Sequence, residues 1–353
     1  MPLLGKITPE LSEHILNFGV FGVELFFVLS GFLIGGILIK TFVQADEFTF
    51  AEVRNFWIRR WFRTVPNYWL VLTASFVLFQ YLKFDPFQLP YLKGYVFLQN
   101  LRHPNILNSF PEGWSLAVEE WFYLTLPVAM YLCAKVLKPA NKARFLFRVF
   151  LGYLLVFVFI RFFNAFDPLN GRDPDEGVRK VVFFRLDAVM YGVLFAYLNY
   201  FKPQVAEKLK GKLLAAGVLL FSALFYLCLH YRLAFMVQTD PVIRFLRNAF
   251  LYVLIPLSFS FCLPYFNSIR TIGSKLFGRV VQHISKVSYS VYLLHFSIVY
   301  RPFFMTMQPT TLKSTLMYYV LYWIVVFGFA TMLYKFFEYP VMALRDRFTP
   351  KNH

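Results

Sequence analysis

The sequence predicts an all-α protein, a polytopic bundle of transmembrane helices. Hydrophobic residues make up 58% of the 353 residues and charged residues only 16%, which leaves too little polar surface to cover a soluble globule. Apolar windows of about 20 residues, the length that crosses a bilayer core of roughly 30 Å, recur along the whole chain. Short charged or proline-containing stretches separate these windows. We therefore expect one membrane domain without a soluble module.

Nine windows define the predicted membrane spans. They lie at 20–40, 65–83, 114–137, 145–163, 181–201, 212–231, 244–264, 287–306 and 316–337. More than half of the 36 Lys and Arg residues fall in or beside the loops after the first, third, fifth, seventh and ninth spans, whereas Asp and Glu favour the other side. The positive-inside rule makes these loops cytoplasmic and predicts a cytoplasmic C-terminus.

The formal charge of +17 is explained by this topology. The basic residues form neither a polar tail nor an amphipathic face, so we predict contact with anionic lipid headgroups and no nucleic-acid partner. The six histidines form no ligand cluster such as His-Glu-x-x-His, and we predict no metal site. A Gly-rich phosphate loop is also missing, which argues against an ATP-driven pump.

The predicted topology divides the chain into an extracytoplasmic N-terminal loop (1–19), a transmembrane domain (20–345) and a cytoplasmic tail (346–353). Nine spans with a cytoplasmic C-terminus place Met1 outside, yet residues 1–19 contain neither a signal peptide nor a hydrophobic span. We therefore expect a further helix upstream of Met1, which would make ten spans with both ends inside. On this hypothesis the sequence begins at an internal Met or is truncated.

The first span, GVFGVELFFVLSGFLIGGILIK, carries two features of interest. Gly31 and Gly35 lie four residues apart, a spacing that lets two helices approach closely in lipid. Glu24 is an ionisable group within the span. Such a group is costly in lipid and is expected to face the bundle interior with a partner, or to be hydrated near the outer end. We interpret Glu24 as a site residue or as a support of the site.

The second span is preceded by RNFWIRRWFRTVPNYW, in which Arg54, Arg59, Arg60 and Arg63 alternate with aromatic residues. One interpretation is a juxtamembrane basic belt with Trp and Tyr anchors. The other is an anion site, because guanidinium forks bind phosphates in a bidentate manner. A coenzyme A donor carries several phosphates, and its base could stack on Trp57 or Trp61. The Arg60-x-x-Arg63 spacing places two forks on one helical face.

The third span begins with PEGWSLAVEEWFYL, where Trp114 is expected to be an interfacial anchor. Glu119 and Glu120 lie about five residues inside this apolar helix. They point about 100° apart, so one can pair with an Arg while the other lines a cavity. A partly desolvated carboxylate could act as a general base toward a sugar hydroxyl or orient a catalytic histidine.

Two later spans contain further ionisable residues. Arg185 and Asp187 lie in the fifth span, where mutual charge neutralisation is the simplest expectation. His295 lies in the eighth span and is either a packing residue with a hydrogen bond or a participant in catalysis.

In these segments the chain resembles the membrane-bound acyltransferase family 3, the bacterial O-acyltransferases that modify surface and secreted glycans. The matching segments occur in the family's order over nearly the whole chain: GVELFFVLSGFLIGG at 22–36, RRWFRTVPNYW at 59–69, GWSLAVEEWFYL at 113–124, FRLDAVMYG at 184–192, SYSVYLLH at 288–295 and FEYP at 337–340.

The resemblance implies a ten-helix bundle in the bacterial inner membrane. The bundle would pass an acyl group, commonly acetyl, from acyl-CoA on the cytoplasmic face to a hydroxyl of an extracytoplasmic glycan, without a permanently bound cofactor. The family's Arg-x-x-Arg pattern falls on Arg60 and Arg63, with Arg59 beside them. Its Trp-Ser-Leu-x-x-Glu-Glu pattern falls on Trp114, Ser115, Leu116, Glu119 and Glu120.

The chain also departs from the family pattern. The family's first helix carries an Arg and an essential His, and we expect this helix upstream of residue 1. His14 lies in polar sequence and is not expected to be that histidine. One alternative is therefore an inactive family member that lacks the first helix. A second alternative is a secondary transporter, which would also use buried charges at bilayer depth.

Overall fold

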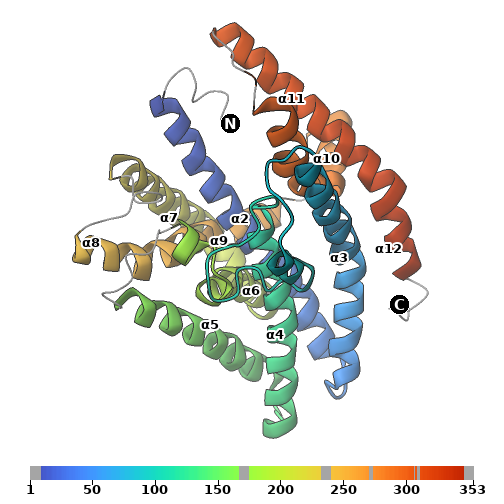
Figure 1. The fold of residues 1–353 in the computed structure, drawn as a ribbon. Helices are drawn as coiled ribbons and strands as arrows, with labels where there is room; N and C mark the ends of the chain where they lie inside the picture. The colour runs from blue at the N-terminus through green and yellow to red at the C-terminus, as the bar shows by residue number, and fades with distance from the viewer. Residues whose placement is uncertain are drawn as a thin grey trace.

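The computed structural model describes residues 9–166, 175–231, 240–269, 273–305, 307 and 311–345, with side chains from Gly19 onward. Within these residues all regular secondary structure is helical (Figure 1). The α-helices are α2 (Pro9–Gln44), α3 (Phe50–Tyr81), α4 (Gly113–Leu137), α5 (Lys142–Phe166), α6 (Leu186–Phe201), α7 (Pro203–His230), α8 (Pro241–Leu246), α9 (Tyr252–Ser268), α10 (Lys275–Leu294), α11 (Leu312–Leu333) and α12 (Tyr339–Arg345). Short 3-10 or π segments are η1 (Leu89–Val96), η2 (Asp175–Arg179), η3 (Val182–Phe184), η4 (Arg247–Leu251), η5 (His295–Phe304) and η6 (Tyr334–Glu338).

The helices confirm a multi-pass, all-α membrane protein. Six helical segments of the described residues are long and apolar enough to cross a membrane, namely Gly19–Gln44, Gly113–Leu137, Lys142–Ala165, Pro203–His230, Pro241–Ser268 and Leu312–Arg345. The other three predicted spans fall on α3, on η3 with α6, and on α10 with η5. Polar and charged residues interrupt α3 and α10, and α6 has only 16 residues. The number of nine spans stays a prediction.

The N-terminal segment is more helical than its polar sequence suggested. Helix α2 begins at Pro9, so its first turns extend into the predicted loop 1–19, while its apolar part begins at Gly19, next to the predicted start of the span. Proline suits the first position of a helix because its φ angle is already fixed near the helical value. The side chain of His14 and the tail 346–353 lie outside the described residues.

Helices α2 and α6 pack closely through glycines. A Cβ atom on Gly31 would lie 1.9 Å from the carbonyl oxygen of Val189, and one on Gly35 would lie 2.9 Å from Cα of Val193. On the facing helix, a Cβ atom on Gly192 would lie 2.0 Å from a carbonyl oxygen of α2. The prediction that the Gly31-x-x-x-Gly35 pair permits close packing is confirmed.

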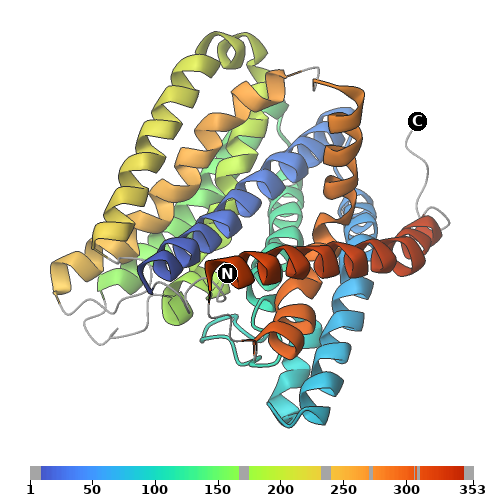
Figure 2. The same ribbon diagram turned by 90° about the horizontal axis from the view of Figure 1, so that it is seen from above.

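The helices form two groups with α4 between them. Helices α2, α5, α6, α7 and α9 pack against one another, and α3, α10, α11 and α12 form the second group. The two groups lie on opposite sides of the molecule in Figure 1. Figure 2 shows that α11, η6 and α12 form one continuous helical rod that runs across α10 and α3. Helix α4 contacts α2, α5 and α6 of the first group and α3 of the second, so it connects the two groups.

Candidate active site

Glu119 and Glu120 lie on the part of α4 that is enclosed by both helix groups. Both side chains are buried, with exposed fractions of 4% and 6%. Because successive residues on a helix point about 100° apart, the two carboxylates have different neighbours. Glu119 contacts α2, and Glu120 contacts α3. The predicted divergence of this pair is therefore present in the structure.

Glu119 is the centre of a hydrogen-bond network. Its Oε1 atom accepts hydrogen bonds from the Ser30 hydroxyl of α2 and from the Tyr123 hydroxyl one turn further along α4. Ser30 Oγ and Tyr123 Oη lie 2.6 Å apart, and Arg60 Nη2 of α3 donates to Tyr123 Oη at 2.7 Å. Arg60 thus reaches Glu119 through Tyr123. These contacts fix the carboxylate among α2, α3 and α4.

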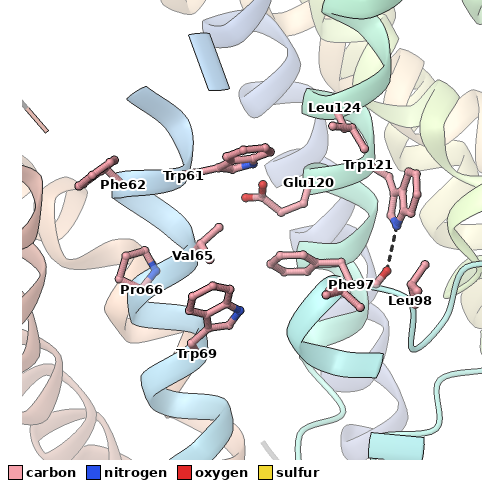
Figure 3. A pocket seen from close by; sticks show the side chains of 11 residues that line it. Trp61, Phe62, Val65, Pro66, Trp69, Phe97, Leu98, Glu120, Trp121 and Leu124 are labelled. Atoms are coloured by element: carbon pink, nitrogen blue, oxygen red, sulfur yellow. Dashed lines mark hydrogen bonds between the residues drawn. The ribbon is translucent and has the colours of Figure 1, made fainter. Parts of the chain in front are cut away.

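Glu120 instead lines a pocket between α3 and α4. Thr64 Oγ1 donates to Glu120 Oε1 at 2.7 Å. The pocket has a volume of about 600 Å³, and Figure 3 shows the Glu120 carboxylate directed into it near the Trp61 ring. The other lining residues are all apolar or aromatic: Trp61, Phe62, Val65, Pro66, Trp69, Val96, Phe97, Leu98, Trp121 and Leu124. Among these described lining residues, Glu120 is the only ionisable one.

The three arginines proposed for phosphate binding differ in their surroundings. Arg60 turns into the bundle, with Cζ 4.6 Å above the Tyr123 ring centroid, whereas Arg63 is exposed and Arg59 is half-buried. Arg63 still interacts electrostatically with Glu119. Arg60 joins the carboxylate network through its hydrogen bond to Tyr123. The anion-binding role of the three arginines stays a prediction.

Trp57 and Trp61, the proposed stacking partners for a nucleotide base, already stack on each other. Their ring centroids lie 5.6 Å apart with 13° between the ring planes. Trp57 Nε1 also donates to the Tyr123 carbonyl oxygen at 3.0 Å, while Trp61 is exposed. A base could therefore stack only on the outer face of this pair.

The prediction that Arg185 and Asp187 neutralise each other is wrong. Arg185 forms an ion pair with Glu24, and Asp187 forms one with Arg161 at 2.7 Å. All four side chains are at most 1% exposed. Residues two apart in a helix point roughly 200° from each other, so Arg185 and Asp187 reach different neighbouring helices. For Glu24 the expectation of an interior position with a partner is confirmed.

Trp114 is a buried residue and not the interfacial anchor that we predicted. It is only 4% exposed and packs edge-on against Phe27 of α2, with ring centroids 5.8 Å apart. The guanidinium of Arg179 lies 4.6 Å from its ring centroid. Asn100 Nδ2 donates to the Trp114 carbonyl oxygen at 3.0 Å and to the Lys180 carbonyl oxygen at 2.6 Å. Packing and loop contacts thus hold the start of α4 inside the protein.

Ser115 and His295 belong to a neighbouring cluster around Tyr292. Ser115 Oγ lies 2.5 Å from Tyr292 Oη, and His295 Nδ1 lies 2.6 Å from the Tyr292 carbonyl oxygen. Because a carbonyl oxygen only accepts hydrogen bonds, Nδ1 carries the proton of the neutral imidazole and Nε2 keeps its lone pair. Within the described residues, His295 forms no hydrogen bond with Glu119 or Glu120. The structure does not join the three candidate catalytic residues into one hydrogen-bonded set.

The family of this chain follows from comparisons with known proteins. A family model described as an acyltransferase domain matches residues 3–335. The chain belongs to the acyltransferase 3 family. The O-acetyltransferase OatA of Staphylococcus aureus (strain NCTC 8325) is 27% identical over 321 residues, which cover 84% of this chain and 49% of that protein. The putative O-acetyltransferase SACOL0978 of Staphylococcus aureus (strain COL) is 25% identical over 320 residues, with the same coverage.

The chain spans about half the length of the curated relatives it matches. No solved structure matches it. The resemblance stated from the sequence motifs is therefore confirmed at the level of the family.

Sequence reasoning missed several polar residues of this acyltransferase 3 chain. Ser30, Thr64 and Tyr123 hold the two carboxylates of α4, and Glu338 accepts hydrogen bonds from Asn67 at 2.9 Å and from Ser290 at 2.6 Å. A hydroxyl or carboxyl group within an apolar span needs a partner, so such residues could have been flagged from the sequence. Arg161 carried the same signal, because it is a charged residue within the predicted fourth span, 145–163.

Proposed function

We propose that this chain is an integral-membrane O-acyltransferase. It transfers an acyl group, acetyl in the simplest case, from acyl-CoA on the cytoplasmic side to a hydroxyl of an extracytoplasmic glycan. Membership of the acyltransferase 3 family and the names of the O-acetyltransferase relatives support the reaction class. The observation that carries the proposal is the pair Glu119 and Glu120, buried where α4 contacts both helix groups.

The proposed reaction requires a base near a shielded acceptor site. In a direct transfer, the acceptor hydroxyl oxygen bonds to the thioester carbonyl carbon, its proton passes to a base, and the carbon–sulfur bond breaks. The thiolate of coenzyme A leaves and takes up a proton. A covalent acyl-enzyme relay would divide the same bond changes into two steps.

Glu120 has the better geometry for proton transfer, because it faces a pocket and accepts a hydrogen bond from the Thr64 hydroxyl. Glu119 accepts hydrogen bonds from two hydroxyl groups, and one of these, on Tyr123, accepts a hydrogen bond from Arg60. This fixed arrangement suits a positioning role. His295, with an Nε2 lone pair, is a further candidate base in the neighbouring cluster.

The donor would bind at the Arg59, Arg60 and Arg63 segment of α3. Exposed Arg63 can reach a phosphate from solvent, and Arg60 would connect the bound donor with the Tyr123 and Glu119 network. The outer face of the Trp57 and Trp61 pair offers a surface for the base. This arrangement is consistent with a bacterial inner-membrane enzyme whose Arg-rich segment and C-terminus face the cytoplasm.

The proposal is tested by mild-base release of ester-linked acyl groups from envelope glycans. A clean deletion of the gene should remove one acid from one glycan, and the full chain supplied in trans should restore it. Glu120→Gln should restore less than about 1% of the ester, since loss of a general base typically costs 10²–10⁴ in rate. Glu47→Gln is the matched control, because Glu47 is an exposed carboxylate outside the site.

Immunoblots of membranes must show equal amounts of each variant. An unchanged acyl content in the deletion strain would contradict the proposed function. Full restoration by Glu120→Gln would contradict the role of that carboxylate.

A further inference from the structure

A second groove lies between α4 and α5, apart from the carboxylates. Its volume is about 690 Å³, within the range of small-molecule sites. Cys133 and Leu137 of α4 line one wall, and Gly152 and Val156 of α5 line the other. A Cβ atom added at Gly152 would meet no atom within 4 Å, so the missing side chain leaves the groove open at its middle.

One end of the groove is basic. Arg144 and Arg148 line it, lie one helical turn apart on the same face of α5, and are both exposed. Neither forms an ion pair with another described residue. The sequence 121–166, which covers most of α4 and all of α5, contains no Asp or Glu. Two guanidinium groups thus lie at the mouth of an apolar groove without a carboxylate from these helices.

The groove matches the length and polarity of a phosphate headgroup with one acyl chain. From Arg144 to Phe157, which also lines it, α5 rises about 20 Å, roughly two-thirds of a bilayer core. The basic end belongs to a loop predicted to be cytoplasmic, so the arginines lie at headgroup level and the apolar walls lie at acyl-chain level. Exposed apolar residues contact lipid all around a membrane protein. This groove combines a hollow with two arginines that form no ion pair with another described residue.

We propose that the groove between α4 and α5 binds one anionic phospholipid, with the phosphate on Arg144 and Arg148 and an acyl chain along Gly152. Guanidinium groups bind phosphate oxygens in a bidentate manner, and basic pockets between membrane helices on the cytoplasmic side recognise anionic headgroups. The lipid would adjoin Tyr153, which lines the groove and whose hydroxyl lies 2.7 Å from that of Thr125 on α4. The bound lipid would therefore stabilise the position of α4, the helix that carries Glu119 and Glu120.

The test is native mass spectrometry of the purified full chain in a neutral detergent, titrated with phosphatidylglycerol or phosphatidylcholine. We expect one phosphatidylglycerol molecule to bind at least tenfold more tightly than phosphatidylcholine. Arg144→Gln with Arg148→Gln should weaken phosphatidylglycerol binding about 30-fold, at about fivefold for each cation. The matched control is Lys208→Gln with Lys212→Gln, which removes two exposed cations one turn apart on α7 and should change binding less than twofold.

Gly152→Leu is a second variant that leaves every charge in place. A Cβ atom at this position meets open space, and Leu favours the helix over Gly, so the protein should fold. The Leu side chain would fill the groove, and binding should fall at least tenfold. Equal binding of the two lipids, equal loss in the arginine and lysine variants, or full binding by Gly152→Leu would each overturn the proposal.

Discussion

The ion pair between Arg185 and Glu24 makes a quantitative prediction about stability. Neither side chain is exposed, so removing one residue leaves the other charge buried without its ion-pair partner. Breaking a buried pair in this way costs about 3–5 kcal/mol, whereas replacing both partners by apolar residues is often neutral. We therefore expect Arg185→Met and Glu24→Met each to lower the unfolding free energy by about 3–5 kcal/mol. The double variant should lose only about 1 kcal/mol, which corresponds to a coupling of about 5 kcal/mol or more.

The assay is equilibrium unfolding of the purified full chain in mixed micelles with increasing SDS mole fraction. A second cycle combines Arg185→Met with Asp187→Asn. Because Asp187 pairs with Arg161, this cycle should give a much smaller coupling than the first. A larger coupling between Arg185 and Asp187 than between Arg185 and Glu24 would refute the pairing, and with it the placement of α6 against α2.

Three further predictions concern packing, donor binding and pH. Gly31→Ala should lower the unfolding free energy by about 1–3 kcal/mol in the same assay, because its Cβ would lie 1.9 Å from a carbonyl oxygen of α6. Gly36→Ala is the control and should not destabilise the protein, because its Cβ would have no atom within 4 Å. Arg60→Ala should raise the KM for acyl-CoA at least tenfold and leave the KM for the acceptor unchanged. Arg54 lies in the exposed start of α3, and Arg54→Ala should change neither KM. Equal effects of Arg60→Ala on both KM values would contradict a donor role. Burial raises the pKa of Glu112, in the loop before α4, from 4.5 to about 7, so the folded state keeps a proton that the unfolded chain releases. Stability should therefore fall as pH rises from about 4.5 to about 7, and Glu112→Gln should flatten this dependence in unfolding measured at several pH values.

The sequence predicted those features that depend on one helix at a time. Hydrophobic windows located the six described helical segments that are long and apolar enough to cross a membrane. The spacing of Gly31 and Gly35 predicted a close helix contact, and the 100° rotation per residue predicted that Glu119 and Glu120 diverge. Each of these features depends only on local periodicity, which can be recognised in one sequence.

The partners of buried polar groups could not be predicted in the same way. Glu24 and Arg185 are 161 residues apart, so nothing local indicates that they meet. Trp114 was expected at the membrane surface, yet Arg179, from a segment far along the chain, covers its ring. Ser30 lies on α2, and only the arrangement of the helices brings its hydroxyl to Glu119. These contacts depend on tertiary packing.

The most direct test of the central claim is acyl transfer by the purified full chain in proteoliposomes. Isotopically labelled acetyl-CoA is supplied on the side of the Arg59–Arg63 segment, and envelope glycan from a deletion strain is supplied on the other. We expect alkali-labile label on the glycan with the wild-type chain and with Glu47→Gln, and a rate at least 100-fold lower with Glu120→Gln. Label that appears at the wild-type rate with Glu120→Gln, or no label with the wild-type chain, would contradict the central claim.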